Sequence, residues 1–163
     1  MNKIIFLDID GVLNSQNTFI ENHEYRKFFV RNMNGSVDDE IIYTMLDIDL
    51  DKVFILRDIC TLTGAKIVIT SCWRRNTDYP LFEEKLTSLG IPIVGVTPYI
   101  NSNRGEEIRK YLEDNEVDEF VILDDEIFRD FNELENHLVK TSFYEDGLTY
   151  EIASEVVRTL RRG

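Results

Sequence analysis

The sequence contains few of the features that mark membrane, secreted or zinc-binding proteins. No apolar run approaches the ~20 residues that a membrane-spanning helix needs, and the run at residues 4–7 is shorter than the hydrophobic region of a secretory signal. The two cysteines, Cys60 and Cys72, form neither a CxxC motif nor a zinc-ligand pattern. We therefore expect a reduced, cytoplasmic protein with no membrane partner.

Proline and glycine are also scarce. The chain has 3 prolines and 8 glycines, and no stretch has the composition of a flexible linker. A chain of 163 residues, 43% of them hydrophobic, is long enough to bury one core and short for two. We predict a single domain over residues 1–163.

Positive charge is the third deficit. Lys and Arg number 18 against 31 for Asp and Glu, which gives a net charge of −13. Residues 106–146 hold 15 acidic and 4 basic side chains, a net charge of −11, so most of the acidity belongs to one segment. This balance excludes a broad duplex-binding face, but it leaves a nucleotide, a phosphorylated small molecule or a nucleic-acid end as partners.

What the chain does contain is an alternation of strand and helix patterns. Strands are predicted at residues 3–7, 66–70, 91–96, 120–123 and 138–141. Helices are predicted at residues 51–63, 80–89, 105–113, 126–137 and 150–161. This order predicts an α/β fold of three layers, with a mostly parallel central sheet covered on both faces.

Residues 15–48 do not fit the alternation. The segment is polar, aromatic and irregular, and it follows the first predicted strand, so we expect a small lid-like insertion at the ligand-binding edge of the sheet. Within it, residues 25–31 (YRKFFVR) mix basic and aromatic side chains. That mixture suits a single nucleic-acid strand or a nucleotide, and it equally suits an ordinary lid with a packed aromatic face.

Polar residues follow three of the predicted strands. They are Asp8, Asp10 and Gly11 after the first, Thr70 and Ser71 after the second, and Asp124 and Asp125 after the fourth. In a parallel sheet these strand ends share one edge, so the side chains should meet in one crevice. Converging carboxylates need a counter-charge, and a hard divalent cation such as Mg²⁺, with oxygen ligands, would supply it.

These segments resemble a known family. FLDIDGVLN (residues 6–14), VITS (68–71) and VILDD (121–125) resemble, in that order, motifs I, II and IV of the haloacid dehalogenase-like (HAD) superfamily. The segments TGAKIVITSCWR, RGEEIRKYL and GLT are further similar to the HAD domain associated with Swiss Army Knife RNA-repair proteins. The resemblance implies a three-layer Rossmannoid fold with a small insertion after the first strand.

The resemblance also implies a phosphatase that works through an aspartyl-phosphate. Asp8 would attack phosphorus, and Asp10 would protonate the leaving oxygen and then activate water. HAD dehalogenases lack this second acid, so Asp10 favours phosphoryl transfer over dehalogenation. Thr70 would donate a hydrogen bond to a phosphoryl oxygen, with Ser71 as the alternative.

Mg²⁺ is the cofactor that the resemblance implies. Its ligands would be the Asp8 carboxylate, the Asp10 backbone carbonyl, and Asp124 or Asp125. The lysine that the family usually places before the helix leading to the last acidic strand is missing here. Arg104 is the expected replacement, because a guanidinium can bind phosphate oxygens bidentately, and Lys110 is the competing candidate.

The substrate-binding candidates are Gly11, Asn14, Ser71 and Arg74. Trp73 and Arg74 come directly after the second motif, where an indole could stack on a base and a guanidinium could pair with a second phosphate. Trp73 could equally pack at a helix start, with Arg74 and Arg75 as structural or surface charges. Two function classes follow: a Mg²⁺-dependent phosphatase of a nucleotide, nucleic-acid end or small metabolite, and a non-catalytic binding module of the same fold.

Overall fold

The computed structural model describes residues 1–161, apart from the side chains of Val37 and Ile41. Its centre is a five-stranded sheet in the order β3-β2-β1-β4-β5, and every pairing in it is parallel. The strands are β1 (Lys3–Leu7), β2 (Lys66–Ile69), β3 (Ile93–Val96), β4 (Glu119–Asp124) and β5 (Leu138–Lys140). The predicted α/β class is confirmed.

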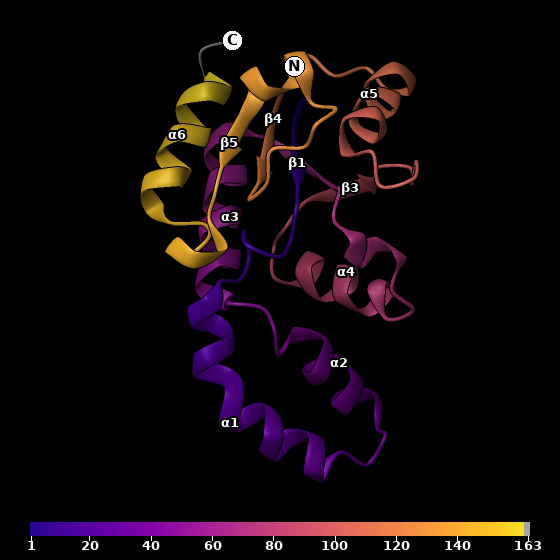
Figure 1. Cartoon of the computed structure of the whole chain (residues 1–163), viewed down its shortest axis with the longest axis vertical. Coiled ribbons are helices and arrows are strands. Elements are labelled where there is room, and N and C mark those ends of the chain that lie inside the picture. The colour runs from indigo at the N-terminus through magenta and orange to yellow at the C-terminus, as the bar shows by residue number, and fades with distance from the viewer. Residues whose placement is uncertain (162–163) are drawn as a thin grey trace.

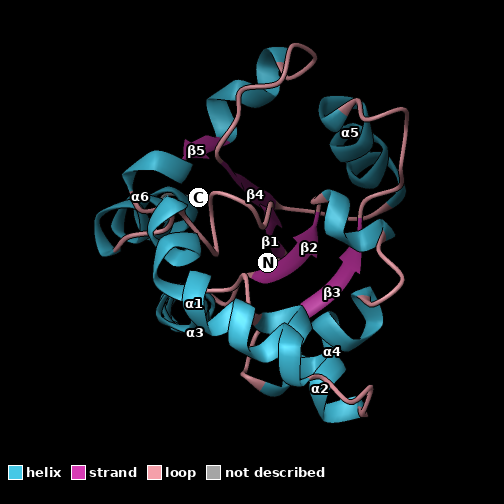
Figure 2. Cartoon of the chain, turned by 60° about the horizontal axis from the view of Figure 1, so that its bottom comes forward, coloured by secondary structure: helices cyan, strands magenta, loops and turns pink. Residues whose placement is uncertain are grey.

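Helices cover both faces of this sheet (Figure 2). They are α3 (Leu50–Thr63), α4 (Tyr79–Ser88), α5 (Arg104–Asp114), α6 (Tyr150–Arg161) and the 3-10 turns η1 (Cys72–Arg75), η2 (Asn132–His137) and η3 (Phe143–Glu145). The larger apolar cluster joins α3, α4 and α6 to one face, and the smaller one joins α5 and η2 to the other. Among the described residues, no helix is both long and apolar enough to cross a bilayer.

The register of the sheet brings the strand ends to one level. Leu7 of β1 pairs with Ile69 of β2 and with Leu123 of β4. The next residue of each strand, Asp8, Thr70 and Asp124, therefore emerges at the same height on the carboxyl edge. Apolar side chains alternate between the two clusters along β1, because both faces of the sheet are buried.

Residues 15–48 form two helices, where we had expected an irregular segment. Helix α1 (Gln16–Asn32) and helix α2 (Val37–Met45) extend as a hairpin away from the sheet (Figure 1). The periodicity missed α1 because only Thr18 and Phe29 of its 17 residues are buried, so it has no apolar stripe. The start of α1 is marked instead by a capping interaction, in which Thr18 Oγ1 accepts a hydrogen bond from Ser15 N at 3.0 Å.

The helix predicted over residues 126–137 is wrong in its first half. Only Asn132–His137 is helical, as the 3-10 turn η2. Asn132 has a positive φ of 47°, a left-handed conformation that an α-helix cannot contain. Phe131 and Leu134 nevertheless pack against the sheet. The apolar pattern therefore predicted the buried residues correctly, but it predicted an α-helix where the chain forms a 3-10 turn.

A buried ion pair ties the segment after β2 to helix α5. Arg74 Nη2 lies 2.8 Å from Glu107 Oε2, and the two side chains are 4% and 2% exposed. Arg74 Nε donates to Thr97 O at 3.0 Å and Nη1 donates to Ser71 O at 2.7 Å, while Glu107 Oε1 accepts from Ile100 N at 2.9 Å. Both charges are thus satisfied from inside the protein.

We predict that Arg74→Ala lowers the free energy of unfolding by about 3–5 kcal/mol, because it leaves the Glu107 carboxylate buried without a counter-charge. The matched control is Arg75→Ala, whose exposed guanidinium lies 3.7 Å from the Tyr99 ring centroid and should contribute less than ~1 kcal/mol. Urea denaturation measures both values. Equal losses in the two variants would show that the Arg74 pair has no special weight.

Candidate active site

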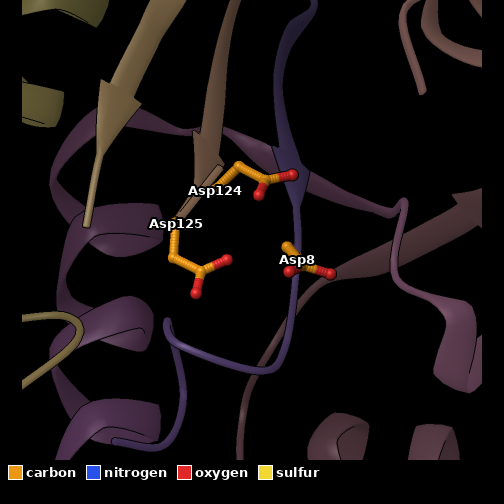
Figure 3. A group of neighbouring side chains, drawn as sticks. All are labelled: Asp8, Asp124 and Asp125. Atoms are coloured by element: carbon orange, nitrogen blue, oxygen red, sulfur yellow. The ribbon is translucent and has the colours of Figure 1, made fainter. Parts of the chain in front are cut away.

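Three carboxylates meet where β1 and β4 end. One oxygen each of Asp8, Asp124 and Asp125 lies within 4.8 Å of the other two (Figure 3). Asp8 is 8% exposed and Asp124 is 0% exposed, so two of the three charges are withdrawn from water. The strand ends that the sequence predicted to meet at this edge therefore bring these three carboxylates together, with Asp8 and Asp125 lining a pocket there.

The three carboxyl groups hold their protons more strongly than free aspartates. Burial raises the pKa of Asp8, against the lowering effect of the Arg104 guanidinium. Burial, followed by repulsion from Asp8, raises the pKa of Asp124 to about 8 and that of Asp125 to about 6. The three carboxylates repel one another, and their oxygens are the donors that hard cations prefer. The group therefore fits a hard divalent cation.

Among the described residues, Arg104 is the one basic residue whose side chain forms ion pairs with Asp8 and Asp124. Its Nη1 donates to Asp124 Oδ2 at 2.7 Å and to Thr70 Oγ1 at 3.1 Å, and it lies 3.4 Å from Asp8 Oδ1. The side chain comes from the first residue of α5 and is packed against the Phe128 ring, 4.7 Å from its centroid. Lys110, the competing candidate, instead contacts Asp114 at 2.9 Å on the exposed side of α5.

Glycine next to Arg104 allows α5 to approach closely. A Cβ on Gly105 would lie 2.3 Å from the backbone oxygen of Asp130. Any side chain there would push the start of α5, and Arg104 with it, away from the segment that follows β4.

Two neighbours fix the Asp10 carboxylate at the mouth of the crevice. Asn14 Nδ2 donates to Asp10 Oδ1 at 2.9 Å and Trp73 Nε1 donates to Asp10 Oδ2 at 3.0 Å. Asn14 is fully buried, and its Oδ1 accepts from Gly11 N at 2.8 Å. Asn14 thus holds the loop after β1; its predicted substrate contact stays a prediction.

Gly11 makes room for Asp125. It has a positive φ of 78°, and a Cβ built on it would lie 2.2 Å from Asp125 Oδ2. Its carbonyl oxygen accepts from Thr141 Oγ1 at 2.6 Å, which ties the loop after β1 to the end of β5. Gly11 is therefore required both by the conformation of the turn and by the third carboxylate.

The residues after β2 divide between the crevice and the interior. Thr70 is fully buried and contacts Arg104, while Ser71 lines the pocket beside Asp8. The Trp73 indole packs on Phe82, with ring centroids 4.9 Å apart. The guanidinium of Arg74 points inward to Glu107, and these contacts account for it without a substrate, so its predicted substrate-binding role is left untested.

The crevice opens into a cavity of about 560 Å³. Its lining combines predicted site residues with a set that the sequence reasoning missed: Lys140, Ser142, Phe143 and Tyr144. The missed residues lie at the end of β5 and directly after it. The rule that selected the ends of β1, β2 and β4 could have found them had it been applied to the last strand.

A family model described as the HAD domain in Swiss Army Knife RNA repair proteins matches residues 4–153. The matched range contains the three acidic residues, Arg104 and Thr70. Neither the curated proteins nor the solved structures contain a match. A parallel sheet with this edge of carboxylates, and a family match over nearly the whole chain, lead to one conclusion: the chain belongs to the family of HAD domains found in Swiss Army Knife RNA repair proteins.

Proposed function

We propose that the chain is a Mg²⁺-dependent phosphatase that acts through an aspartyl-phosphate on a nucleotide or a nucleic-acid end. The observation that carries the proposal is the position of Asp8. Its carboxylate lies at the base of a 560 Å³ cavity, beside two further carboxylates and the Arg104 guanidinium. A non-catalytic binding module has no need of a buried carboxylate cluster that opposes its own folding.

In the first step, an Asp8 oxygen attacks phosphorus and forms the aspartyl–phosphorus bond as the bond to the ester oxygen breaks. Asp10 gives its proton to that leaving oxygen, which departs as an alcohol. The hydrogen bonds from Asn14 and Trp73 hold both Asp10 oxygens, so the acid has a fixed orientation toward the cavity.

In the second step, Asp10 takes a proton from water. The oxygen of that water attacks phosphorus, the bond to Asp8 breaks, and inorganic phosphate leaves with Asp8 restored. The Arg104 guanidinium, which lines the cavity and lies 3.4 Å from Asp8, can donate hydrogen bonds to phosphoryl oxygens. Thr70 Oγ1, the predicted second donor, is buried and accepts from Arg104 Nη1 at 3.1 Å.

The residues that would hold Mg²⁺ are Asp8, Asp124 and Asp125, with the Asp10 carbonyl as the further predicted ligand. When bound, the cation would offset the negative charge of the nucleophile and of the phosphoryl group. Mg²⁺ commonly takes one or two carboxylates, and Arg104 contacts Asp8 and Asp124, so Asp8 would be joined as a direct ligand by either Asp124 or Asp125.

The nucleotide preference is supported by the family and by the size of the cavity. The family description names RNA repair proteins. The cavity volume of about 560 Å³ lies within the ~300–1,000 Å³ range of drug-sized ligand sites, far more than the five heavy atoms of a phosphate group occupy.

A panel of phosphate monoesters tests the proposal. It contains 2′-, 3′- and 5′-phosphorylated nucleotides and oligonucleotides together with sugar phosphates, each with Mg²⁺ and with EDTA. We expect Mg²⁺-dependent phosphate release, fastest on the nucleotide group. Faster release from sugar phosphates would instead indicate a metabolite phosphatase, and no Mg²⁺-dependent release from the panel would refute the phosphatase.

We predict that Asp8→Asn lowers kcat at least ~1,000-fold, because it removes the nucleophile. The chain should remain folded, since burial raises the pKa of Asp8 and a neutral amide is therefore accepted there. Circular dichroism and phosphate release measure the two effects, with Asp114→Asn on the exposed surface as the matched control. Near wild-type turnover would mean that Asp8 is not the nucleophile.

Mg²⁺ should raise the unfolding temperature of the chain by roughly 5–10 °C at a concentration ~100-fold above its Kd. Asp124→Asn and Asp125→Asn should each reduce this shift, and the larger loss identifies the direct ligand. Differential scanning calorimetry with Mg²⁺ or EDTA measures it independently of turnover. An unchanged shift in both variants would place the cation elsewhere.

Arg104→Ala should lower kcat/KM by about 100-fold or more, because a preorganised donor to phosphate is lost, and Arg104→Lys should recover part of the loss by restoring the charge. Lys110→Ala should stay within about twofold of the wild type, since Lys110 pairs with Asp114 on the surface. Steady-state phosphate release decides whether Arg104 or Lys110 takes the place of the lysine that the family usually has. Greater damage from the Lys110 variant would reverse the assignment.

A further inference from the structure

The active-site cavity has one side that the phosphatase chemistry does not use. The 140–144 segment, which begins at the last residue of β5, contributes Lys140, Ser142, Phe143 and Tyr144 to its lining. None of these residues is needed to transfer a phosphoryl group. We therefore expect this side of the cavity to contact the part of the substrate to which the phosphate is attached.

Tyr144 is the aromatic residue on this side that is open to a ligand. It is 77% exposed, although it lines the same cavity as Asp8. Its ring meets Phe143 edge-on, with centroids 5.4 Å apart and an interplanar angle of 88°. An edge-on neighbour orients the Tyr144 ring and leaves a ring face available for stacking.

The segment that presents Tyr144 is held in place from both sides. Phe143 packs against Phe19 of α1, with centroids 5.8 Å apart, so the hairpin supports the turn η3 (Figure 1). Asp146, two residues on, accepts from Ser15 Oγ at 3.2 Å and pairs with the buried Lys52 Nζ at 3.3 Å. A platform tied to the base of the hairpin keeps a constant position relative to Asp8.

The aromatic residues that follow β2 and β3 are engaged elsewhere. The Trp73 indole donates to Asp10 and packs on Phe82, and it does not line the cavity. The Tyr99 ring is covered by the Arg75 guanidinium at 3.7 Å. Base stacking, which the sequence suggested for Trp73, is therefore better served by Tyr144.

Lys140 adds positive charge on the same side. It is exposed at the end of β5 and lines the cavity, and within residues 1–161 Arg104 is the other basic residue that does so. Arg104 is occupied by Asp8, Asp124 and Thr70. A ligand in this cavity would thus meet both the Tyr144 ring and the Lys140 ammonium group, whose Nζ also donates to Thr141 O at 3.2 Å.

We propose that Tyr144 is the stacking platform for the base of a nucleoside whose phosphate reaches Asp8, which makes the recognised unit a nucleoside monophosphate. This inference rests on the proposed phosphatase function and specifies its substrate class. The unit is either a free nucleotide or the terminal nucleotide of a single strand, because both present the same base and phosphate.

The test compares two substrates that differ only in the base, adenosine 5′-phosphate and ribose 5-phosphate. We expect the wild type to prefer the nucleotide in kcat/KM, and Tyr144→Ala to reduce that preference about tenfold, as expected for the loss of one base–aromatic stack. Tyr144→Phe should restore the preference, because the ring is retained. Equal losses on both substrates, or an unchanged preference, would overturn the proposal.

Tyr150→Ala is the matched control. Tyr150 is 73% exposed on α6 and does not line the active-site cavity, so its removal should leave the preference as in the wild type. A loss there equal to that of Tyr144→Ala would also overturn the proposal, since the effect would not be specific to the cavity.

A binding measurement separates this inference from the phosphatase proposal. Isothermal titration calorimetry of the Asp8→Asn chain with the same two ligands reports the base contribution without turnover, and the wild-type chain in EDTA serves if that variant does not fold. Tighter nucleotide binding that weakens in the Tyr144→Ala background supports the platform even if no phosphate is released. Equal affinity for both ligands would count against it.

A 5′-phosphorylated oligonucleotide with a terminal adenosine identifies the source of the nucleotide. A Tyr144-dependent preference on the oligonucleotide assigns the platform to a strand end, and one confined to the mononucleotide assigns it to a free nucleotide. The absence of a Tyr144 effect on both would overturn the proposal.

Discussion

The burial of Asp8 beside Asp124 is the constraint on which the rest of the site depends. The two carboxylates are buried close together and therefore repel each other. Among the described residues, Arg104 is the one whose guanidinium bridges them. Its position in turn requires α5 to begin against the segment after β4, and only a glycine at position 105 permits that approach. The position at which α5 begins is therefore linked to the need for Arg104 to offset the charges of Asp8 and Asp124.

The hairpin of α1 and α2 is joined to the loop that follows β5. Its first helix starts after Ser15, whose hydroxyl donates to Asp146, and α3 resumes the domain with Lys52 paired to that same aspartate. The hairpin and the loop after β5 consequently share one anchor. The same loop is joined to the turn after β1, where Thr141 Oγ1 donates to Gly11 O beside Asp125.

The sequence could predict the parts of the site that obey simple rules. Apolar runs followed by Asp8, Thr70 and Asp124 were sufficient, because parallel strands end on one edge. Helix α1 was not predictable by periodicity, since it buries only two side chains. The inward turn of Arg74 was equally hidden, because its partner Glu107 lies 33 residues away and only the folded chain brings them together.

One hydrogen bond of the site has a spectroscopic consequence. Trp73 is the single tryptophan of the chain, and its indole N–H donates to Asp10. Tryptophan fluorescence therefore comes from one indole, whose N–H group contacts the proposed acid and base. The tryptophan emission of the unlabelled protein is a native optical signal from the edge of the sheet that carries the candidate site, available without any introduced probe.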